Sequence, residues 1–234
     1  QIQQTFIPSV LPDHPNWQLA ARWRTARQVG GDFYDVIELP NNRLGIFIAD
    51  VADKGMPAAL FMALTRTLVR AAVLETNSPA EALRRVNNSL LPDTQQGMFV
   101  TAIYGELDIV EGTFTYVNAG HNPPFWARAN GGLEKLSRTG IALGVTDEPN
   151  ISERVISLGR GDTLLLYTDG LTEAFSPDGD LFGEVRLMDV MSSLQAGSAE
   201  EVIRAVEDCL NEFVDTLPLS DDLTMIAIRM TGAE

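Results

Sequence analysis

The sequence predicts an α+β domain in which helices pack outside antiparallel sheet. Strand-like segments are joined mainly by short turns, and neighbouring strands connected in this way must run antiparallel. Helix-like segments come in two pairs, one after the first strands and one near the end of the chain. The 234 residues are 45% hydrophobic and 21% charged, which is an ordinary globular profile for one large domain or two small ones.

The first part of the chain is expected to form strands and then a pair of helices. Residues 17–24 alternate as a strand does, and residues 32–50 indicate two strands joined by an Asn-Asn turn. A helix is expected from Pro57, because proline is favoured at the first helical position and the run after it is rich in Ala and Leu. A second helix is expected from the N-cap Ser78 to about Leu91.

The rest of the chain returns to strands before it closes with helices and one last strand. Residues 198–215 carry apolar side chains at helical spacing and predict the last helix. The remaining predicted strands are residues 98–108, residues 113–120, a hairpin in 123–136, two strands around a Gly-rich turn in 153–169, and residues 223–230.

Composition excludes several classes of partner and setting. The net charge of −15 argues against nucleic acid or an anionic membrane as the main partner. A single cysteine excludes an internal disulfide framework and fits a cytoplasmic setting. No uninterrupted apolar run approaches the roughly 20 residues of a membrane span, and the chain has no signal-peptide pattern. We therefore expect a cytoplasmic location with no membrane contact by this region.

The start of the chain predicts how it is organised. It begins with Gln1 rather than Met, and Pro8 and Pro12 interrupt the first helix-like segment. We therefore expect residues 1–12 to be the end of a linker helix from a preceding region. Residues 13–234 are expected to form a single domain.

Four segments place aspartates at the end of a strand-like run, beside a small residue. An aspartate in such a place is ordinarily a turn or cap residue. Several carboxylates gathered at one end of a sheet would repel one another unless cations lay between them. These aspartates are Asp32 and Asp35, Asp50 and Asp53, Asp169, and the pair Asp221 and Asp222.

All-oxygen ligand sets suit hard divalent cations such as Mg²⁺ and Mn²⁺. Two such ions a few ångströms apart lower the pKa of a water molecule between them and provide a nucleophile at neutral pH. The chain has two histidines and one cysteine, which disfavours a zinc site of the usual kind. The residues therefore predict a two-metal hydrolase.

Six motifs together resemble the SpoIIE/RsbU branch of the PPM family of metal-dependent protein phosphatases, which is related to the type-2C enzymes. They occur in the order and approximate spacing of that branch, and the resemblance covers essentially residues 17–230. The motifs are VGGDFYDV, IADVADKGMPAALFMA, FVTAIYGELD, YVNAGHNPPFW, LLLYTDGLTEAF and SDDLTMIAI.

The resemblance implies a four-layer α/β/β/α sandwich, with two stacked antiparallel sheets flanked by helical pairs, for a PPM-type domain at residues 13–234. It implies hydrolysis of phosphoserine or phosphothreonine by a metal-activated water, with two or more Mn²⁺ or Mg²⁺ ions. The implied substrate is a regulatory phosphoprotein, a STAS-type anti-anti-sigma factor. The implied setting is the output domain of a larger signalling protein, with an upstream regulatory domain, and the resemblance allows a homodimer.

The resemblance also implies roles for individual residues. Asp50 would bridge both metals, with the carbonyl of Val51 as a further ligand. Asp169 and Asp221 would bind one of the metals, and Asp32 would act directly or through the water shell. Asp50 and Asp169 are the residues expected to carry catalysis.

Asp222 is a second candidate ligand, which ranks below Asp221 because type-2C enzymes often have Asn there. The register of this motif is open by one residue. Arg27 lies five residues before Asp32, where type-2C enzymes carry an arginine that grips phosphate. The fork of its guanidinium fits that task.

The second motif departs from the type-2C pattern. Type-2C enzymes have Asp-Gly-His-Gly there, whereas this chain has no histidine between Asp50 and Gly55. The general acid is therefore unassigned, with a metal-bound water or Lys54 as candidates. His121, in the fourth motif, is interpreted as a hydrogen-bonded loop residue rather than a ligand or an acid.

Two other functions compete with an active protein phosphatase. One is a phosphatase-fold module that binds a phosphoprotein with weak or no catalysis, which the retained aspartates disfavour. The other is a two-metal phosphodiesterase, which the charge balance disfavours. The helical pair that follows Asp50 is interpreted as a lever through which an upstream region regulates the site.

Overall fold

The structure is a computed structural model that describes residues 3–94, 97–193 and 197–232. The chain forms two compact units. The first comprises residues 1–10, 29–121 and 137–157, and the second comprises residues 11–28, 122–136 and 158–234. The first two residues of the predicted linker tail lie outside the described part of the chain.

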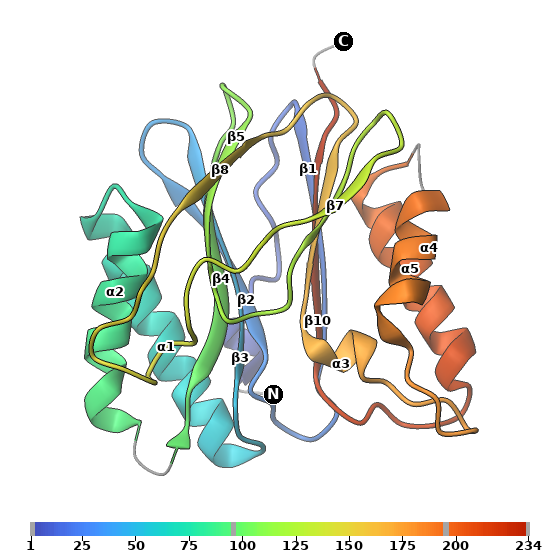
Figure 1. The fold of residues 1–234 in the computed structure, drawn as a ribbon, viewed down its shortest axis with the longest axis horizontal. Helices are drawn as coiled ribbons and strands as arrows, with labels where there is room; N and C mark the ends of the chain where they lie inside the picture. Colours follow the sequence, from blue (N-terminus) through green and yellow to red (C-terminus); the bar gives the residue numbers. More distant parts are fainter. Residues whose placement is uncertain (1–2, 95–96, 194–196, 233–234) are drawn as a thin grey trace. The chain divides into compact units, whose positions relative to one another are not determined.

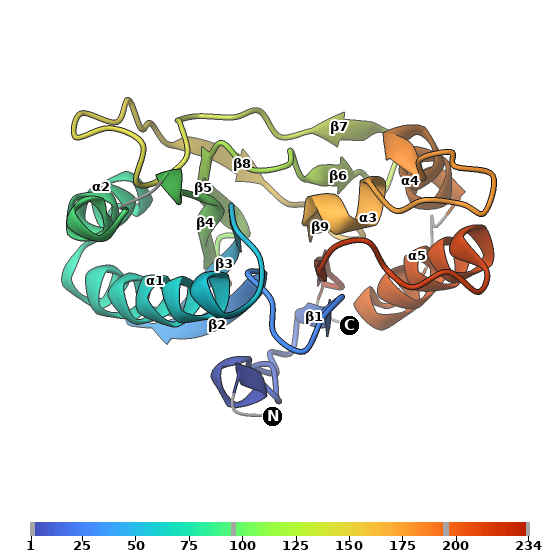
Figure 2. The same cartoon turned by 90° about the horizontal axis from the view of Figure 1, so that it is seen from below.

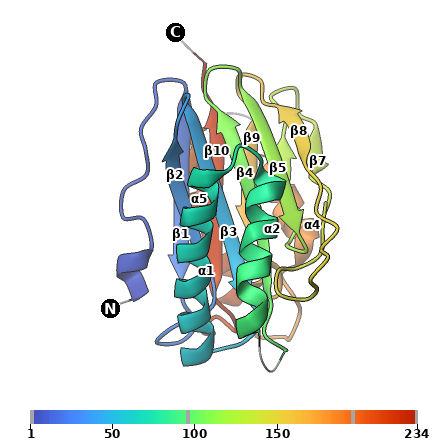
Figure 3. The same ribbon diagram turned by 90° about the vertical axis from the view of Figure 1, so that its left-hand side faces the viewer.

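The sheet of the first unit has five described strands, all antiparallel to their neighbours (Figure 3). The predicted turn after β2 is present, with Asn41 and Asn42 at φ of 62° and 55°. Two central residues with positive φ are typical of a tight hairpin turn. In sheet order the strands are β2 (Phe33–Leu39), β3 (Arg43–Val51), β4 (Val100–Asp108), β5 (Thr113–Ala119) and β8 (Arg154–Ser157).

A pair of helices covers one face of this sheet (Figures 1 and 3). Helix α1 (Met56–Glu75) packs on β2 and β3, and α2 (Pro79–Leu90) packs on β4 and β5. As predicted, Ser78 caps α2 by accepting a hydrogen bond from the N–H of Glu81. Two 3₁₀ segments, η1 (Gln3–Phe6) and η2 (Leu91–Asp93), complete the unit.

Helix α1 is long and apolar enough to cross a membrane by length and composition alone. The sequence did not predict this, because Thr and Arg residues interrupt the apolar run of the helix. Its buried side chains, such as Phe61 and Met62, belong to the core beneath it. A core helix passes the same test as a span, so the result is weak evidence for a membrane helix.

The second unit has its own antiparallel sheet of five described strands. Helix α5 packs on β1 and β10, and α4 packs on β6 and β7 (Figure 2). In sheet order the strands are β1 (Trp17–Arg24), β10 (Leu223–Met230), β9 (Thr163–Tyr167), β6 (Phe125–Ala127) and β7 (Leu133–Lys135). The helices are α3 (Asp169–Thr172), α4 (Gly183–Ser193) and α5 (Ala199–Val214).

The predicted α+β class, with antiparallel sheets and a helical pair on each, is confirmed. The two strands predicted in residues 153–169 do not pair with each other. Both strands are present, but β8 pairs with β5 in the first unit, whereas β9 pairs with β6 and β10 in the second. The Gly-rich segment between them is therefore a crossing from one sheet to the other.

Candidate active site

The first unit brings two of the predicted ligands to the same end of its sheet. Asp32 directly precedes β2, and Asp50 is the next-to-last residue of β3. The two strands pair antiparallel with Phe33 opposite Ala49, so Asp32 and Asp50 follow as neighbours at that end. Asp32 is 2% exposed, and Asp50 is half-buried.

A glycine allows this end of the sheet to close tightly. A β-carbon at Gly31 would lie 3.0 Å from the carbonyl oxygen of Val51 and 3.2 Å from its Cβ. A larger residue would therefore push the segment before Asp32 away from the end of β3. The Gly-Gly pair in front of Asp32 is the sequence signal for this close approach, although Gly31 was not among the predicted site residues.

The other aspartates of these segments have structural tasks. Asp35, 1% exposed on β2, accepts two hydrogen bonds from Arg70 of α1, at 2.6 and 2.7 Å. Arg66 adds an ion pair to Asp35 at 3.1 Å. Asp53 is exposed, and its side chain accepts the N–H of Lys54 at 2.7 Å.

His121 is a buried loop residue, as predicted. Its N–H donates to the side chain of Asn118 at 2.8 Å, and its carbonyl accepts a hydrogen bond from Arg138 at 3.2 Å. Its Nδ1 lies 2.7 Å from the hydroxyl of Thr101. Thr101 is the residue of β4 that pairs with Asp50, so this network abuts the Asp50 end of β3.

An open groove of about 650 Å³ adjoins the same place in the first unit. Thr101 lines it, next to the strand position of Asp50. Arg138 is the charged residue among the groove's described lining. The other lining residues are Phe99, Gly120, Thr139, Gly140, Ile141, Ala142, Asn150 and Ser152.

The second unit gathers its own predicted ligands at one end of its sheet. Asp169 follows β9 as the first residue of α3, and Asp222 directly precedes β10. Thr168 and Thr224 tie these ends together, since each backbone N–H donates to the other residue at 3.0 Å. Asp169 is half-buried and Asp222 is 8% exposed.

Gly170 lies in close contact with the backbone of Asp222. A β-carbon there would lie 1.9 Å from the carbonyl oxygen of Asp222, a separation that no side chain tolerates. The glycine after Asp169 is thus required for Asp169 and Asp222 to lie side by side. Asp221 is half-buried, and its Oδ1 accepts the N–H of Asp222 at 3.0 Å.

Arg27 also belongs to the second unit, in the bend after β1. It is exposed, and its carbonyl accepts the hydroxyl hydrogen bond of Thr25 at 2.7 Å. This fixes the backbone of the bend while the long side chain remains at the surface.

A family model described as stage II sporulation protein E (SpoIIE) matches residues 40–231. The chain belongs to the SpoIIE family. It is 34% identical over 255 residues to protein IcfG of Synechocystis, and 28% identical over 229 residues to phosphoserine phosphatase RsbU of Bacillus subtilis. Each match covers 97% of this chain; the chain spans 40% of IcfG and 68% of RsbU.

Solved structures show the same fold. The RsbU and RsbW domains of Rv1364c from Mycobacterium tuberculosis align at a TM-score of 0.79 and 29% identity, over 94% of this chain and 61% of that one. The SiaA-PP2C domain of Pseudomonas aeruginosa aligns at 0.85 and 24% identity, over 98% and 93%. The family match confirms the predicted family, and its relative RsbU is named a phosphoserine phosphatase. The solved structures confirm the fold.

The residues of this SpoIIE-family chain fit a divalent cation by the chemistry of their donors. Every predicted ligand offers oxygen, either a carboxylate or the carbonyl of Val51, which is the set that Mg²⁺ and Mn²⁺ prefer. Gly31 leaves that carbonyl close to the Asp32 segment. Among the described residues no three His, Cys, Asp or Glu side chains form a ready metal cluster.

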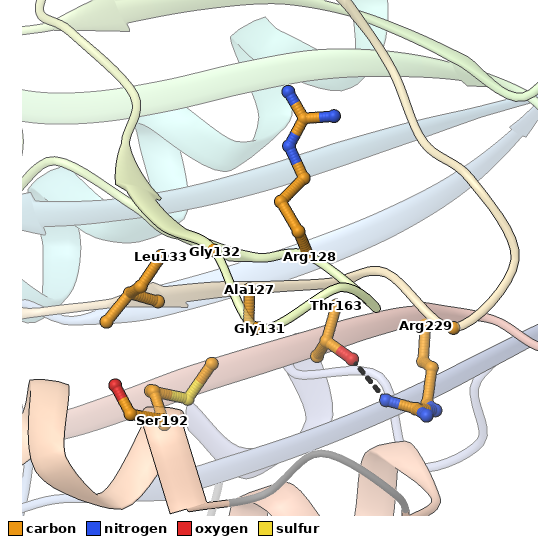
Figure 4. A pocket seen from close by; sticks show the side chains of 10 residues that line it. Ala127, Arg128, Gly131, Gly132, Leu133, Thr163, Ser192 and Arg229 are labelled. Atoms are coloured by element: carbon orange, nitrogen blue, oxygen red, sulfur yellow. Dashed lines mark hydrogen bonds between the residues drawn. The ribbon is translucent and has the colours of Figure 1, made fainter.

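Figure 4 shows a second pocket of the SpoIIE-family chain, which none of these aspartates lines. Thr163 and Arg229 line it, and the guanidinium donates to the threonine hydroxyl at 2.7 Å. Strand β9 begins at Thr163, whereas Asp169 follows its other end. With a volume of about 10 Å³ the pocket holds at most one water molecule and has no part in the candidate active site.

Proposed function

We propose that this chain hydrolyses phosphoserine or phosphothreonine on a regulatory phosphoprotein, with divalent metal ions as cofactors. One observation carries the proposal. In each unit, aspartates from separate segments arrive at a single end of the sheet, where a glycine permits close backbone contact. If these aspartates were only turn residues, nothing would require both units to place them in this way.

The proposed ligands divide between the units. Asp32, Asp50 and the Val51 carbonyl come from the first, and Asp169 and Asp221 come from the second. Asp222 is the alternative to Asp221. We assign two or more Mn²⁺ or Mg²⁺ ions to this set. When bound, such ions lower the pKa of water and offset phosphate charge.

This acidic chain needs local positive charge to bind a phosphorylated substrate, which is an anion. A net charge of −15 repels an anion, so local cations must act against the general field. We assign the phosphate contact to Arg27, whose exposed guanidinium presents a planar pair of donors. Lys54, also exposed and three residues after Val51, is a candidate proton donor to the leaving oxygen.

The groove beside Asp50 is the proposed place for the polypeptide around the phosphorylated residue. It is open, and Arg138 puts one cation among otherwise uncharged groups. Its position next to Thr101 places it one strand from Asp50.

The proposed substrate is a STAS-type anti-anti-sigma phosphoprotein. Support comes from relatives named phosphoserine phosphatase RsbU and phosphoserine phosphatase RsbP, both from Bacillus subtilis. Because the chain spans 40% of IcfG and 68% of RsbU, we propose that it is the output domain of a larger cytoplasmic signalling protein. An upstream regulatory domain would then control it, and a homodimer is compatible with that arrangement.

The test is phosphate release from a phosphoserine-containing STAS-domain protein, measured with Mn²⁺ and with excess chelator. We expect release with metal, loss with chelator, and a fall of at least about 100-fold for Asp50→Asn and Asp169→Asn. Asp53→Asn is the matched control, because this nearby aspartate is exposed and only caps its own turn. Its activity should stay within about twofold of the wild type.

The competing functions give different results in the same assay. Tight binding of the phosphoprotein without phosphate release would favour the binding module. Faster hydrolysis of bis(p-nitrophenyl) phosphate than of the phosphoserine substrate would favour a phosphodiesterase. Activity that survives both chelation and Asp50→Asn would overturn the metal-dependent mechanism.

A further inference from the structure

Gln3 is a buried polar residue in η1, near the start of the described chain. It is 9% exposed, and its carboxamide makes two hydrogen bonds to one residue, Gly30. Its Nε2 donates to the Gly30 carbonyl at 2.6 Å, and its Oε1 accepts the Gly30 N–H at 3.1 Å. A glutamine side chain thus takes the place of a neighbouring strand for a single residue of the backbone.

Gly30 belongs to the short segment that delivers Asp32 to the candidate active site. It is followed by Gly31, which packs against the Val51 carbonyl, and then by Asp32 itself. Two successive glycines make this backbone intrinsically free. Contacts made by the neighbouring chain therefore have to determine its position.

The segment around Gln3 is anchored to the first unit at further points. The carbonyl of Pro8 accepts a hydrogen bond from the hydroxyl of Tyr34, at 3.0 Å, and Tyr34 lies on β2 two residues after Asp32. The guanidinium of Arg66, on α1, lies 6.0 Å from the centre of the Phe6 ring. Figure 3 shows η1 next to α1 and β2. Gln3 is thus presented from a fixed segment.

The two hydrogen bonds between Gln3 and the backbone of Gly30 require a carboxamide side chain. Only a carboxamide supplies one donor and one acceptor in a plane, as the Gly30 backbone requires. Alanine would leave a buried N–H and a buried carbonyl without their partners, and glutamate would lack the donor. A buried backbone group that loses its partner costs about 1–3 kcal/mol unless the segment moves to find water. We expect the glycine segment to move.

We propose that Gln3 is a positioning residue for Asp32, which holds the Gly30–Asp32 segment in the conformation that binds metal. The inference rests on the proposed function through the role of Asp32 as a ligand. The competing explanation is that Gln3 only satisfies a buried backbone group.

The experiment compares Gln3→Ala and Gln3→Glu with Gln4→Ala in the full 234-residue chain. Gln4 is the matched control, because the same side chain one residue later is exposed. Amide hydrogen exchange of residues 28–33 and Mn²⁺ binding by electron paramagnetic resonance are measured, together with thermal unfolding. Neither main readout depends on turnover.

For both Gln3 variants we expect faster exchange in residues 28–33 and Mn²⁺ binding weakened about tenfold or more, as for partners that orient metal ligands. Gln4→Ala should match the wild type. A folded Gln3 variant with faster exchange but unchanged Mn²⁺ affinity would show that Gln3 has only the structural role. Unchanged exchange would overturn the proposal outright.

Two further outcomes keep the proposal and the proposed function separate. If Gln3→Ala unfolds, hydrogen exchange and Mn²⁺ binding of Gln3→Glu test the proposal instead. Glutamate keeps the shape of the side chain and one of its hydrogen bonds. If the wild type itself binds no Mn²⁺ and Asp50→Asn behaves identically, the proposed metal-dependent function fails. Unchanged metal affinity in a Gln3 variant, beside a loss in Asp50→Asn, overturns the positioning role alone.

Discussion

The carboxylate of Asp222 accepts a hydrogen bond from the backbone N–H of Ala26, at 2.9 Å. Ala26 directly precedes Arg27, the proposed phosphate-binding residue, in the bend after β1. Asp222 therefore joins the start of β10 to the segment that carries Arg27. Asp221, its neighbour, is half-buried, and its Oδ1 accepts the N–H of Asp222.

These different surroundings predict different effects of substitution. Asp221→Asn should weaken Mn²⁺ binding with little change in the free energy of unfolding, because it removes charge from a half-buried proposed ligand. Asp222→Ala should lower that free energy by about 1–2 kcal/mol and raise KM, because Ala26 loses its acceptor. Calorimetric metal titration and thermal unfolding measure the two effects.

The control for this pair is Asp222→Asn, whose amide oxygen can still accept the N–H of Ala26. We expect it to unfold close to the wild type and to bind Mn²⁺ far better than Asp221→Asn. The reverse order of metal affinities would show that Asp222 is the ligand and that the motif register shifts by one residue.

Gly170 provides a test of the second-unit geometry that leaves all carboxylates in place. In Gly170→Ala the new methyl group meets the carbonyl oxygen of Asp222 at 1.9 Å, so the backbone between Asp169 and Asp222 must separate. We expect a loss of about 2 kcal/mol or more in the free energy of unfolding. Mn²⁺ affinity should fall as well. Gly159→Ala is the control for glycine substitution itself, because a β-carbon there would meet nothing closer than 3.7 Å.

Asp35 should matter for stability rather than for metal binding. It is buried and accepts two hydrogen bonds from Arg70, so Asp35→Asn leaves Arg66 and Arg70 facing a neutral group. Removing one partner of a buried pair can cost 3–5 kcal/mol. We expect about 2 kcal/mol here, because Arg70 is 43% exposed and can return to water. Denaturant unfolding measures the loss; a Mn²⁺ affinity reduced as strongly as in Asp50→Asn would contradict this assignment.

The sequence predicted most elements of the fold because their signals are local. The Asn-Asn turn required positive φ, Ser78 capped a helix, and apolar spacing marked α5. It did not predict that β8 and β9 join different sheets, because the side chains of a strand do not specify its partner. The apolar length of α1 was also missed, since charged residues on its exposed and half-buried positions interrupt the pattern.

The individual aspartates of the candidate site could be predicted from the sequence, but the residues that hold them in position could not. Aspartates at strand ends carry a recognisable signal, and the structure brings Asp32 near Asp50 and Asp169 near Asp222. The same signal includes Asp35, whose neighbours are arginines on a helix far along the chain. The contact between Gln3 and Gly30 spans 27 residues and follows no local pattern. Such supports depend on tertiary structure.

A last prediction concerns Glu106, which lies on β4 away from the proposed metal ligands. It is 5% exposed; Arg43 pairs with it at 2.5 Å, and the hydroxyl of Tyr104 donates to it at 3.1 Å. Burial raises the pKa of Glu106 above its ordinary value of 4.5, Arg43 lowers it, and Glu153 adds to the rise, with a net increase. The folded state therefore holds this proton more tightly than the unfolded state does.

It follows that ionisation of Glu106 costs folding free energy. The contribution of the protonated group is fully present below pH 4.5 and is lost as pH rises through the raised pKa. Glu106→Gln stays neutral and keeps an acceptor for Tyr104. We expect the free energy of unfolding of the wild type, relative to this variant, to fall as pH rises above 4.5. Urea unfolding across that range measures the difference; a rise with pH would mean that attraction to Arg43 outweighs desolvation.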